Sequence, residues 1–412
     1  MTELITQLCQ ITAEILQDNP QADVAKLVGL VKQRIDANSQ LGEAIQGDRN
    51  LMKSLQPVGI PRNIPRSGVT RFVGREDALL TLHNQLQQGN LVAISAIAGM
   101  GGVGKTELAI QYAEKYEEVY QGGLCWLFAR SENIGTQIVS FAQAQMGLKV
   151  PEGLDKVDDQ VAFCWRNWRS GDVLVVLDDV VSYPIVEPYL PPRDARFKVL
   201  MTTRLKFGSP IQILPLEVLS LEQSLELLGS IIGQERIDQE PEIAATLCTW
   251  LEYLPLGLEL VGRYLVALPE LSLSTLLLLL QEKAKIRQAL RHKSLDVEQE
   301  TLTSTAKLGV EAAFNLSWGL LEEGSQHLGK LLSLFAPAPI PWELVERIEQ
   351  EYYQTNPDRG EFELEELEAA RAKLISFHLF QNIDLRTYRL HSLIREFFRG
   401  KLEGEEYATD VS

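Results

Sequence analysis

The sequence predicts an α/β domain with a parallel sheet covered on both faces, preceded by a small helical module and followed by two mainly helical regions. Between residues 69 and 218, short apolar runs alternate with stretches of helical periodicity. The short runs are apolar at nearly every position, which is typical of strands buried on both faces. After about Leu219 helical patterns replace these runs, so the sheet is expected to end there.

The strands and helices of the α/β domain are expected in a regular order. Helical spacing of apolar residues predicts helices over 75–86 and 106–118. Strands are predicted for the four apolar runs at 91–97, 123–129, 172–180 and 197–204. Helical patterns lie between most of these runs, as parallel strands require.

The regions on either side of the α/β domain differ from it in residue composition and periodicity. Residues 1–56 are predicted to form a small helical module, and residues 57–68, with three prolines and two glycines, a linker or extended arm. Residues 219–295 are predicted to be all-helical. Residues 306–402 start as helix and finish with two short apolar runs, a turn and a helix, which suggests helices closed by a small hairpin. Residues 403–412 form an acidic tail.

Composition restricts the class of protein. The chain has 412 residues, of which 45% are hydrophobic and 23% charged, as expected of a soluble protein with several domains. We find no run long enough for a membrane span and no signal-peptide pattern, so a cytoplasmic protein is expected. The net charge of −17 argues against nucleic acid as the main partner. The four cysteines are scattered, and neither a disulfide framework nor a zinc site is predicted.

A glycine-rich loop stands between the first predicted strand and the helix after it. Residues 99–106, GMGGVGKT, match the pattern G-x-x-x-x-G-K-[ST] in the strand–loop–helix setting that the pattern requires. Glycines allow consecutive N–H groups to point at phosphate oxygens, and the helix adds its positive N-terminus. Lys105 is expected to neutralise the β- and γ-phosphates, and Thr106 to bind Mg²⁺. The fold class is therefore a P-loop nucleotide-binding α/β domain.

Charged residues follow two further strands. Asp178 and Asp179 end the run at 172–180, at the edge of the sheet where the phosphate loop also lies. Asp178 is expected to hold Mg²⁺ through water, and Asp179 to orient or deprotonate an attacking water. Arg204 follows the next strand and is a candidate contact to the γ-phosphate.

The order of six motifs resembles a known family. FVGRED (72–77), GMGGVGKT (99–106), LVVLDD (174–179), VLMTTR (199–204), LPLGLEL (254–260) and LHSLIREF (390–397) occur in one series. This series resembles the NB-ARC branch of the STAND signalling ATPases, which contains apoptotic ATPases and plant disease-resistance proteins. The resemblance covers about residues 70–400, and the whole series is far more specific than the phosphate loop alone.

The resemblance implies an arrangement of domains around one adenine nucleotide. It implies a nucleotide-binding domain over 69–218, an ARC1-like helical domain over 219–295 and a winged-helix domain over 306–402. The N-terminal module occupies the place of the family's effector or adaptor domain. Implied partners are ATP or ADP with Mg²⁺, an effector protein, and further copies of the chain on activation; neither nucleic acid nor a membrane is expected.

The resemblance also implies roles for individual residues. Val73 and Arg75 would lie on the adenine side and Pro255 would pack on the base. Arg204 would report the γ-phosphate, and His391 would reach the β-phosphate of ADP. The implied catalytic set is Lys105, Asp178, Asp179 and Arg204. The implied nucleotide contacts are Val73, Arg75, Gly99, Gly101, Gly102, Val103, Gly104, Lys105, Thr106, Glu107, Pro255 and His391.

The sequence departs from the family pattern in two places. Ser392 follows His391 where the family usually has aspartate, so a carboxylate that would brace the histidine is missing. Members usually carry a long C-terminal repeat array that detects the trigger, whereas this chain stops after the predicted winged helix. A fragment, a truncated chain and a member with another sensor all remain open.

The leading hypothesis is a signalling switch with weak ATPase activity. ADP would keep the domains closed, exchange for ATP would open them and permit assembly, and slow hydrolysis would reset the state. One alternative is a DNA-binding regulator, because Arg389, Arg395, Arg399 and Lys401 make the predicted last helix locally basic. Another is an AAA+-type remodelling ATPase, although Asp178-Asp179 lacks the glutamate usual in that class.

Overall fold

The computed structural model describes most of the chain after residue 58. The described residues are 59–69, 71–96, 101–130, 133–205, 207, 211–291, 305–355 and 362–409. The helical module predicted for 1–56 and the predicted contact Gly99 lie outside these residues. The chain divides into two compact units, residues 1–59 with 144–147, and residues 60–143 with 148–412. Within the described part, no helix is long and apolar enough to cross a membrane.

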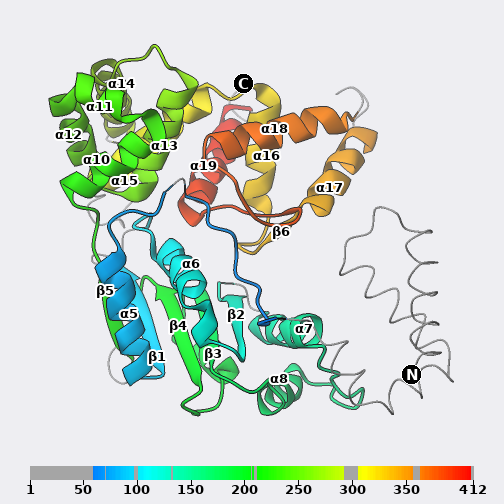
Figure 1. Cartoon of the computed structure of the whole chain (residues 1–412). Helices are drawn as coiled ribbons and strands as arrows, with labels where there is room; N and C mark the ends of the chain where they lie inside the picture. Colours follow the sequence, from blue (N-terminus) through cyan, green and yellow to red (C-terminus); the bar gives the residue numbers. More distant parts are fainter. Residues whose placement is uncertain are drawn as a thin grey trace, which may run out of the picture. The chain divides into compact units, whose positions relative to one another are not determined.

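A parallel sheet organises the first part of the larger unit. Among the described residues, five strands form it in the order β2-β3-β4-β1-β5. They are β1 Leu91–Ala96, β2 Gly123–Phe128, β3 Val173–Val180, β4 Phe197–Thr203 and β5 Gln212–Leu216 (Figure 1). Every residue of β4 is buried, so both faces of the sheet are covered. The first four strands confirm the sequence prediction.

The edge strand β5 was not predicted. It is five residues long, only two of them are buried, and it contains Pro215. Proline lacks a backbone donor and is confined to positions such as sheet edges, so the usual strand signals are weak here. This segment forms a strand because it pairs with β1 on one side, and its own residue pattern does not predict a strand.

Helices α5 and α6 contact each other and cover one face of the sheet. Helix α5 packs on β1, β4 and β5, and α6 packs on β1, β3 and β4. Apolar residues at helical spacing, such as Leu79, Leu82 and Leu86 in α5, form the buried stripe. The helices of this part are α5 Glu76–Gln88, α6 Lys105–Lys115, α7 Ile134–Met146, α8 Val157–Arg166 and α9 Tyr183–Val186, with 3-10 turns at Glu117–Val119 and Glu187–Tyr189.

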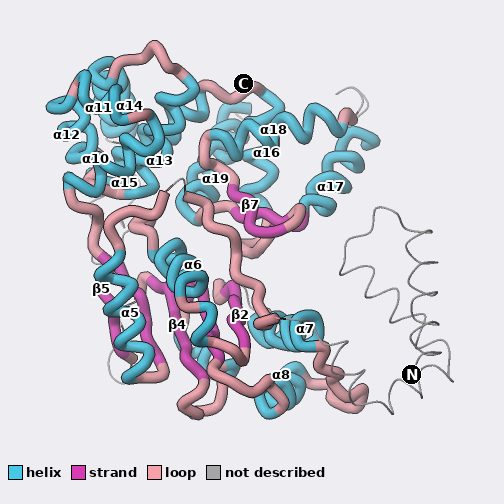
Figure 2. Tube along the Cα trace, in the orientation of Figure 1, coloured by secondary structure: helices cyan, strands magenta, loops and turns pink. Residues whose placement is uncertain are grey.

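Five helices follow the sheet, as predicted for the described part of 219–295. They are α10 Leu221–Ile232, α11 Gln234–Gln239, α12 Pro241–Trp250, α13 Pro255–Ala267 and α14 Leu273–Arg291 (Figure 2). Ser220 and Gln223 cap α10 reciprocally in a capping box. Helix α13 is buried along most of its length and packs on α10 and α15. Its first residues, Pro255 and Leu256, lie next to the phosphate loop, where Leu256 N–H donates to Gly102 O (3.3 Å).

The C-terminal region combines helices with a small antiparallel sheet. Its elements are α15 Thr305–Gly319, α16 Glu323–Leu334, β6 Ile340–Pro341, α17 Trp342–Thr355, α18 Leu364–Ser376, β7 Gln381–Asp384, β8 Thr387–Arg389 and α19 Ser392–Thr409. The sheet order is β6-β8-β7, so the predicted terminal hairpin is present as β7 and β8. Helix α16 packs on α18 and α19. Helix α15 packs on α13 and α14 as well as on α19, so it also belongs to the core of the preceding helices.

The segment 60–68, called the arm below, runs beside the edge strand β2. Leu124 N–H donates to Pro61 O (2.8 Å), and the side chain of Asn63 bonds both the N–H (2.7 Å) and the O (2.9 Å) of Trp126. Further along, Arg66 N–H donates to Ile383 O of β7 (3.0 Å), and Ser67 donates to Glu107 (2.6 Å). The arm therefore contacts the sheet, α6 and the terminal hairpin.

Candidate functional site

A cavity of about 160 Å³ lies at the carboxyl ends of the parallel strands. Carboxyl ends of parallel strands are where open α/β sheets bind their ligands. The cavity is lined by the strand ends, by the phosphate loop with α6, by the start of α13, and by the segment between β8 and α19. Its polar and loop residues include Gly101, Gly102, Gly104, Lys105, Thr106, Glu107, Arg130, Asp178, Asp179, Thr202, Arg204, Pro255, Arg389, His391, Ser392 and Arg395.

The phosphate loop has the backbone that its glycines permit. Gly102 and Gly104 have φ values of +83° and +96°, a region that side chains rarely adopt. Gly104 is the N-cap of α6, and Lys105 and Thr106 form the first turn of that helix. Free N–H groups of the first turn and the helix dipole therefore face the cavity end of α6. This geometry suits an anion.

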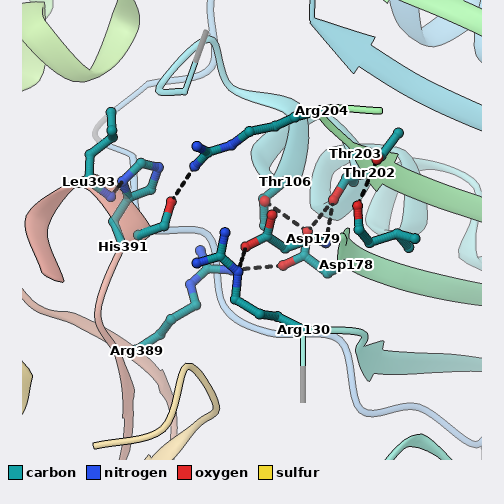
Figure 3. Close-up of polar contacts among 12 residues, drawn as sticks. Thr106, Arg130, Asp178, Asp179, Thr202, Thr203, Arg204, Arg389, His391 and Leu393 are labelled. Carbon is teal, nitrogen blue, oxygen red and sulfur yellow. Dashed lines mark hydrogen bonds and ion pairs between the residues drawn. The ribbon is translucent and has the colours of Figure 1, made fainter. Parts of the chain in front are cut away.

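Asp178 is buried at the end of β3, with both carboxylate oxygens engaged. Oδ1 accepts hydrogen bonds from Thr106 Oγ1 (2.8 Å) and Thr202 Oγ1 (2.6 Å), and Oδ2 lies 3.3 Å from Nη1 of Arg389 (Figure 3). Burial raises the pKa of Asp178, while Arg389 and the two hydroxyls oppose that rise. Asp178 thus joins α6, β4 and β8 at one point.

Asp179 has a different environment from its neighbour. Its φ is +60°, unusual for a residue with a side chain, and the strand pairing is irregular between Leu177 and Val180. The Asp179 carboxylate pairs with Nε of Arg130 (2.9 Å), while its N–H donates to Thr202 Oγ1 (2.8 Å). The irregular backbone therefore turns successive carboxylates toward different partners.

Arg204 and His391 meet where α19 begins. Nη2 of Arg204 donates to Oγ of Ser392 (2.7 Å), and Leu393 N–H donates to Nδ1 of His391 (3.2 Å) (Figure 3). An Nδ1 that accepts leaves the proton on Nε2 in the neutral ring. Burial and the nearby Arg389 and Arg204 guanidinium groups lower the pKa of His391 to about 3. The imidazole is therefore neutral at pH 7.

Positive charge gathers around the cavity. Burial and the proximity of Arg204 lower the pKa of Lys105 to about 8, although Asp179 and Asp178 oppose this shift. Four arginines line the same cavity, namely Arg130, Arg204, Arg389 and Arg395. A phosphate group placed among these cations would relieve their mutual repulsion and raise the pKa of Lys105 again.

The remaining predicted residues divide into two groups. Pro255 is the first residue of α13 and lines the cavity, as does Glu107, which accepts from Ser67 and Gln111. Val73, Arg75 and Val103 are described but are not among the lining residues. Arg75 instead donates to the backbone oxygens of Val103 (3.3 Å) and Glu217 (2.8 Å). Arg75, predicted for the adenine side, therefore contacts the phosphate loop at Val103 without lining the cavity.

Three residues that contact Asp178 or Asp179 escaped sequence reasoning. Thr202 lies inside the quoted motif VLMTTR, where only the final arginine was singled out. Arg130 follows β2 just as Arg204 follows β4, so its position after a strand was an available signal. Arg389 was noted only as a basic residue for DNA. Its distance from Asp178 in the sequence left no local signal for an ion pair.

The donors present fit a magnesium ion. Thr106 supplies a hydroxyl and Asp178 a carboxylate, and their oxygens are 2.8 Å apart. Mg²⁺ prefers oxygen ligands and is usually held by one or two protein groups together with phosphates and water. These two side chains are therefore the pair that would hold it.

Comparisons with known proteins find a matching family model and several relatives. The family model described as NB-ARC domain matches residues 75–238. The regulatory protein AfsR of Streptomyces griseus is 26% identical over 407 residues, covering 96% of this chain and 38% of AfsR. The disease resistance protein RPS5 of Arabidopsis thaliana is 28% identical over 204 residues, covering 46% of this chain and 23% of RPS5.

Among solved structures, the chain is similar to a Signal Transduction ATPase with Numerous Domains (STAND) protein with a tetratricopeptide repeat sensor from Pyrococcus horikoshii. The identity is 19%, the TM-score is 0.48, and the match covers 83% of this chain and 44% of that one. The chain spans well under half the length of the AfsR relatives that it matches. Residues 75–238 thus match the NB-ARC domain model, and the chain is homologous to AfsR and to plant disease-resistance proteins.

Proposed function

We propose that this protein is a nucleotide-dependent signalling switch. The observation that carries the proposal is the shared lining of one cavity by the phosphate loop and by residues 389–392 of the C-terminal region. A ligand in that cavity would contact both parts of the chain. Its identity would therefore influence whether the two parts stay together. We call the arrangement described above, with Arg204 bonded to Ser392, the closed arrangement.

The proposed ligand is ADP in the closed arrangement and ATP with Mg²⁺ in an open one. The glycine loop and Lys105 would bind the phosphates, and Thr106 and Asp178 would hold Mg²⁺. The metal would supply positive charge for the phosphate oxygens. Val73, Arg75 and Pro255 would contact the adenine side. Arg204 would sense the γ-phosphate.

His391 is proposed to hold the β-phosphate of ADP from the C-terminal region. Its neutral ring carries the proton on Nε2, so it can donate one hydrogen bond without adding charge. The γ-phosphate of ATP would compete with Ser392 for Arg204 and so weaken the closed arrangement. A few kcal/mol of differential affinity is enough to move such an equilibrium.

Hydrolysis is proposed to be slow and to serve as a reset. Asp179, the candidate for orienting the attacking water, is paired with Arg130 at 2.9 Å in the closed arrangement. The arginine occupies a carboxylate oxygen that would otherwise be available to hold the attacking water. We therefore propose a weak ATPase whose rate sets the lifetime of the open state.

The regions that flank the nucleotide-binding domain have proposed roles in the switch. Residues 306–402 are proposed to be a winged-helix domain, which is compatible with helices closed by the β7–β8 hairpin and followed by α19. The N-terminal module is proposed to engage an effector, and the open form to assemble with further copies of the chain. The proposed compartment is the cytoplasm.

DNA binding through the last helix gains little support from the site. Arg389 faces Asp178, and Arg395 donates to the backbone oxygen of Phe335. Lys401 donates to Asn315 (2.8 Å). These three cations of the basic stretch are thus engaged within the protein, whereas a DNA-reading helix presents such residues to phosphates and bases.

Two measurements test the switch. Protein purified without added nucleotide and denatured should release ADP, detected by chromatography, in near-stoichiometric amount. Lys105→Ala should lose this ADP and bind added nucleotide at least about a hundredfold more weakly, because the loop loses its central cation. Lys115→Ala, at the exposed end of the same helix, is the matched control and should retain ADP. Equal ADP affinity in both variants would refute the site.

A further inference from the structure

Arg389 reaches Asp178 from the C-terminal region in a position fixed by its own hairpin. It is the last residue of β8 and pairs in register with Gln381 of β7. Nη2 of Arg389 donates to Oε1 of Gln381 (3.1 Å), and Nη1 faces Oδ2 of Asp178 at 3.3 Å (Figure 3). Only 17% of the Arg389 side chain is exposed. The hydrogen bond to Gln381 therefore holds the guanidinium at the carboxylate without any contact to nucleotide.

The ligand atoms proposed for Mg²⁺ satisfy each other in this arrangement. Thr106 donates its hydroxyl proton to Asp178 Oδ1, which also accepts from Thr202. Oδ2 faces Arg389. The Thr106 oxygen keeps lone pairs for a metal, so the conflict lies at Asp178. A divalent cation there would share the carboxylate with Arg389 and would stand close to its guanidinium in a buried place. Like charges in poorly solvated surroundings repel strongly.

We infer that Arg389 and a divalent metal exclude each other at Asp178. In the closed arrangement Arg389 supplies the positive charge there, so the closed form accepts a nucleoside diphosphate without metal. A metal-loaded nucleotide is accepted only when the β7–β8 hairpin has withdrawn Arg389. This inference rests on the proposed nucleotide switch, and it adds the metal as a second determinant of closure beside the γ-phosphate.

The exclusion has a reciprocal consequence. If closure weakens metal binding, metal binding weakens closure by the same factor. Removing the Arg389 guanidinium should make metal binding and closure independent of each other. The closed form would then tolerate metal together with ADP.

The direct test measures metal affinity in the ADP complex of the full chain. Mn²⁺, followed by electron paramagnetic resonance, is the probe. Arg389→Met keeps the stem of the side chain and removes its charge. We expect Mn²⁺ to bind the ADP complex of Arg389→Met at least about tenfold more tightly than that of the unmodified chain, a typical size for coupling between sites.

The matched control is Arg386→Met on the same hairpin. Arg386 is more than half exposed, pairs with Glu346 and is not among the cavity residues. Its removal should leave Mn²⁺ affinity unchanged. Adding Asp178→Asn to Arg389→Met should abolish the gain, because the carboxylate is the shared partner. Equal Mn²⁺ affinity in the unmodified chain and Arg389→Met, or a gain that survives Asp178→Asn, would overturn the inference.

A second test uses only the unmodified chain, so it does not depend on whether a variant folds. Calorimetric ADP affinity should be nearly the same in EDTA and in millimolar Mg²⁺. Tightening by about tenfold or more with Mg²⁺ would contradict the exclusion, because linkage would then show that closure and metal cooperate. Failure to bind ADP under either condition would instead refute the proposed switch itself.

Discussion

At the scale of single residues, Thr202 organises the two carboxylates that end β3. Its hydroxyl donates to Asp178 Oδ1 (2.6 Å) and accepts from the Asp179 N–H (2.8 Å). One buried hydroxyl thus satisfies one donor and one acceptor on consecutive residues. Valine would match its shape but leave both groups without this partner. The orientation of the candidate metal ligand therefore depends on a neighbour in β4.

Lys105 makes nucleotide binding dependent on pH. Its pKa is lowered to about 8 in the site without ligand, and bound phosphates should raise it again. A group whose pKa rises on binding contributes its full affinity below the lower pKa and loses it as the pH rises through that value. ADP affinity measured by calorimetry should therefore fall by about tenfold between pH 7.5 and pH 9.

Lys105→Arg is the control for this pH dependence. The guanidinium stays charged throughout the range, so its ADP affinity, even if weaker, should change little between the same two pH values. A profile as steep as that of the unmodified chain would assign the titration to another group.

At the scale of elements, the first turn of α19 meets the end of β4. Helix α19 begins at Ser392, whose hydroxyl accepts from Arg204, and Arg395 N–H donates to His391 O as the helix starts. A helix N-terminus carries partial positive charge. Arg204 therefore approaches a positive pole with only a neutral hydroxyl between them. An aspartate at this position would carry a negative charge facing both Arg204 and the helix N-terminus, so the contact with serine is weaker than an aspartate contact would be.

Ser392→Asp should strengthen the closed arrangement. The carboxylate would form a charge-assisted bond with Arg204 and stabilise the N-terminus of α19. Release of a fluorescent ADP analogue, followed by stopped flow, should slow by about tenfold, equivalent to about 1.4 kcal/mol. Ser392→Ala should accelerate release. Faster release from Ser392→Asp would mean that the contact does not retain ADP.

At the scale of the larger unit, the cavity depends on three stretches of chain that fold against one another. Gly102 O accepts from Leu256 N–H, which ties the phosphate loop to α13, and Asp178 and Arg204 tie the strand ends to residues 389–392. The arm adds contacts from Asn63 to β2 and from Arg66 to β7. A ligand that binds this arrangement should therefore stabilise the sheet and the hairpin together.

Hydrogen exchange can test this coupling. At a hundred times its Kd, ADP should stabilise the folded chain by about 2.7 kcal/mol. Peptides from β4 and from β8 should then gain protection together. His391→Ala should give less protection of β8 at the same ADP concentration, because one link between nucleotide and C-terminal region is missing. Protection confined to β4 would show that the C-terminal region does not respond to ADP.

Local patterns made much of this molecule predictable. The apolar runs at β1 to β4 specify strands because both faces of these strands are buried, and GMGGVGKT specifies its loop because glycines adopt the backbone it needs. The short edge strand β5 and the partners Arg130, Thr202 and Arg389 were missed. Their roles depend on neighbours that the sequence places elsewhere.

The sequence by itself determined the parallel sheet, the helical regions after it, and the phosphate loop with Lys105 and Thr106 at the start of α6. These features follow from periodicity and from backbone freedom within a few residues. Only the tertiary structure decided that Asp178 faces Arg389, across 211 positions of the chain, and that Arg204 bonds Ser392. Such contacts depend on how complete elements pack, because ion pairs form between side chains that burial brings together, whatever their separation along the chain.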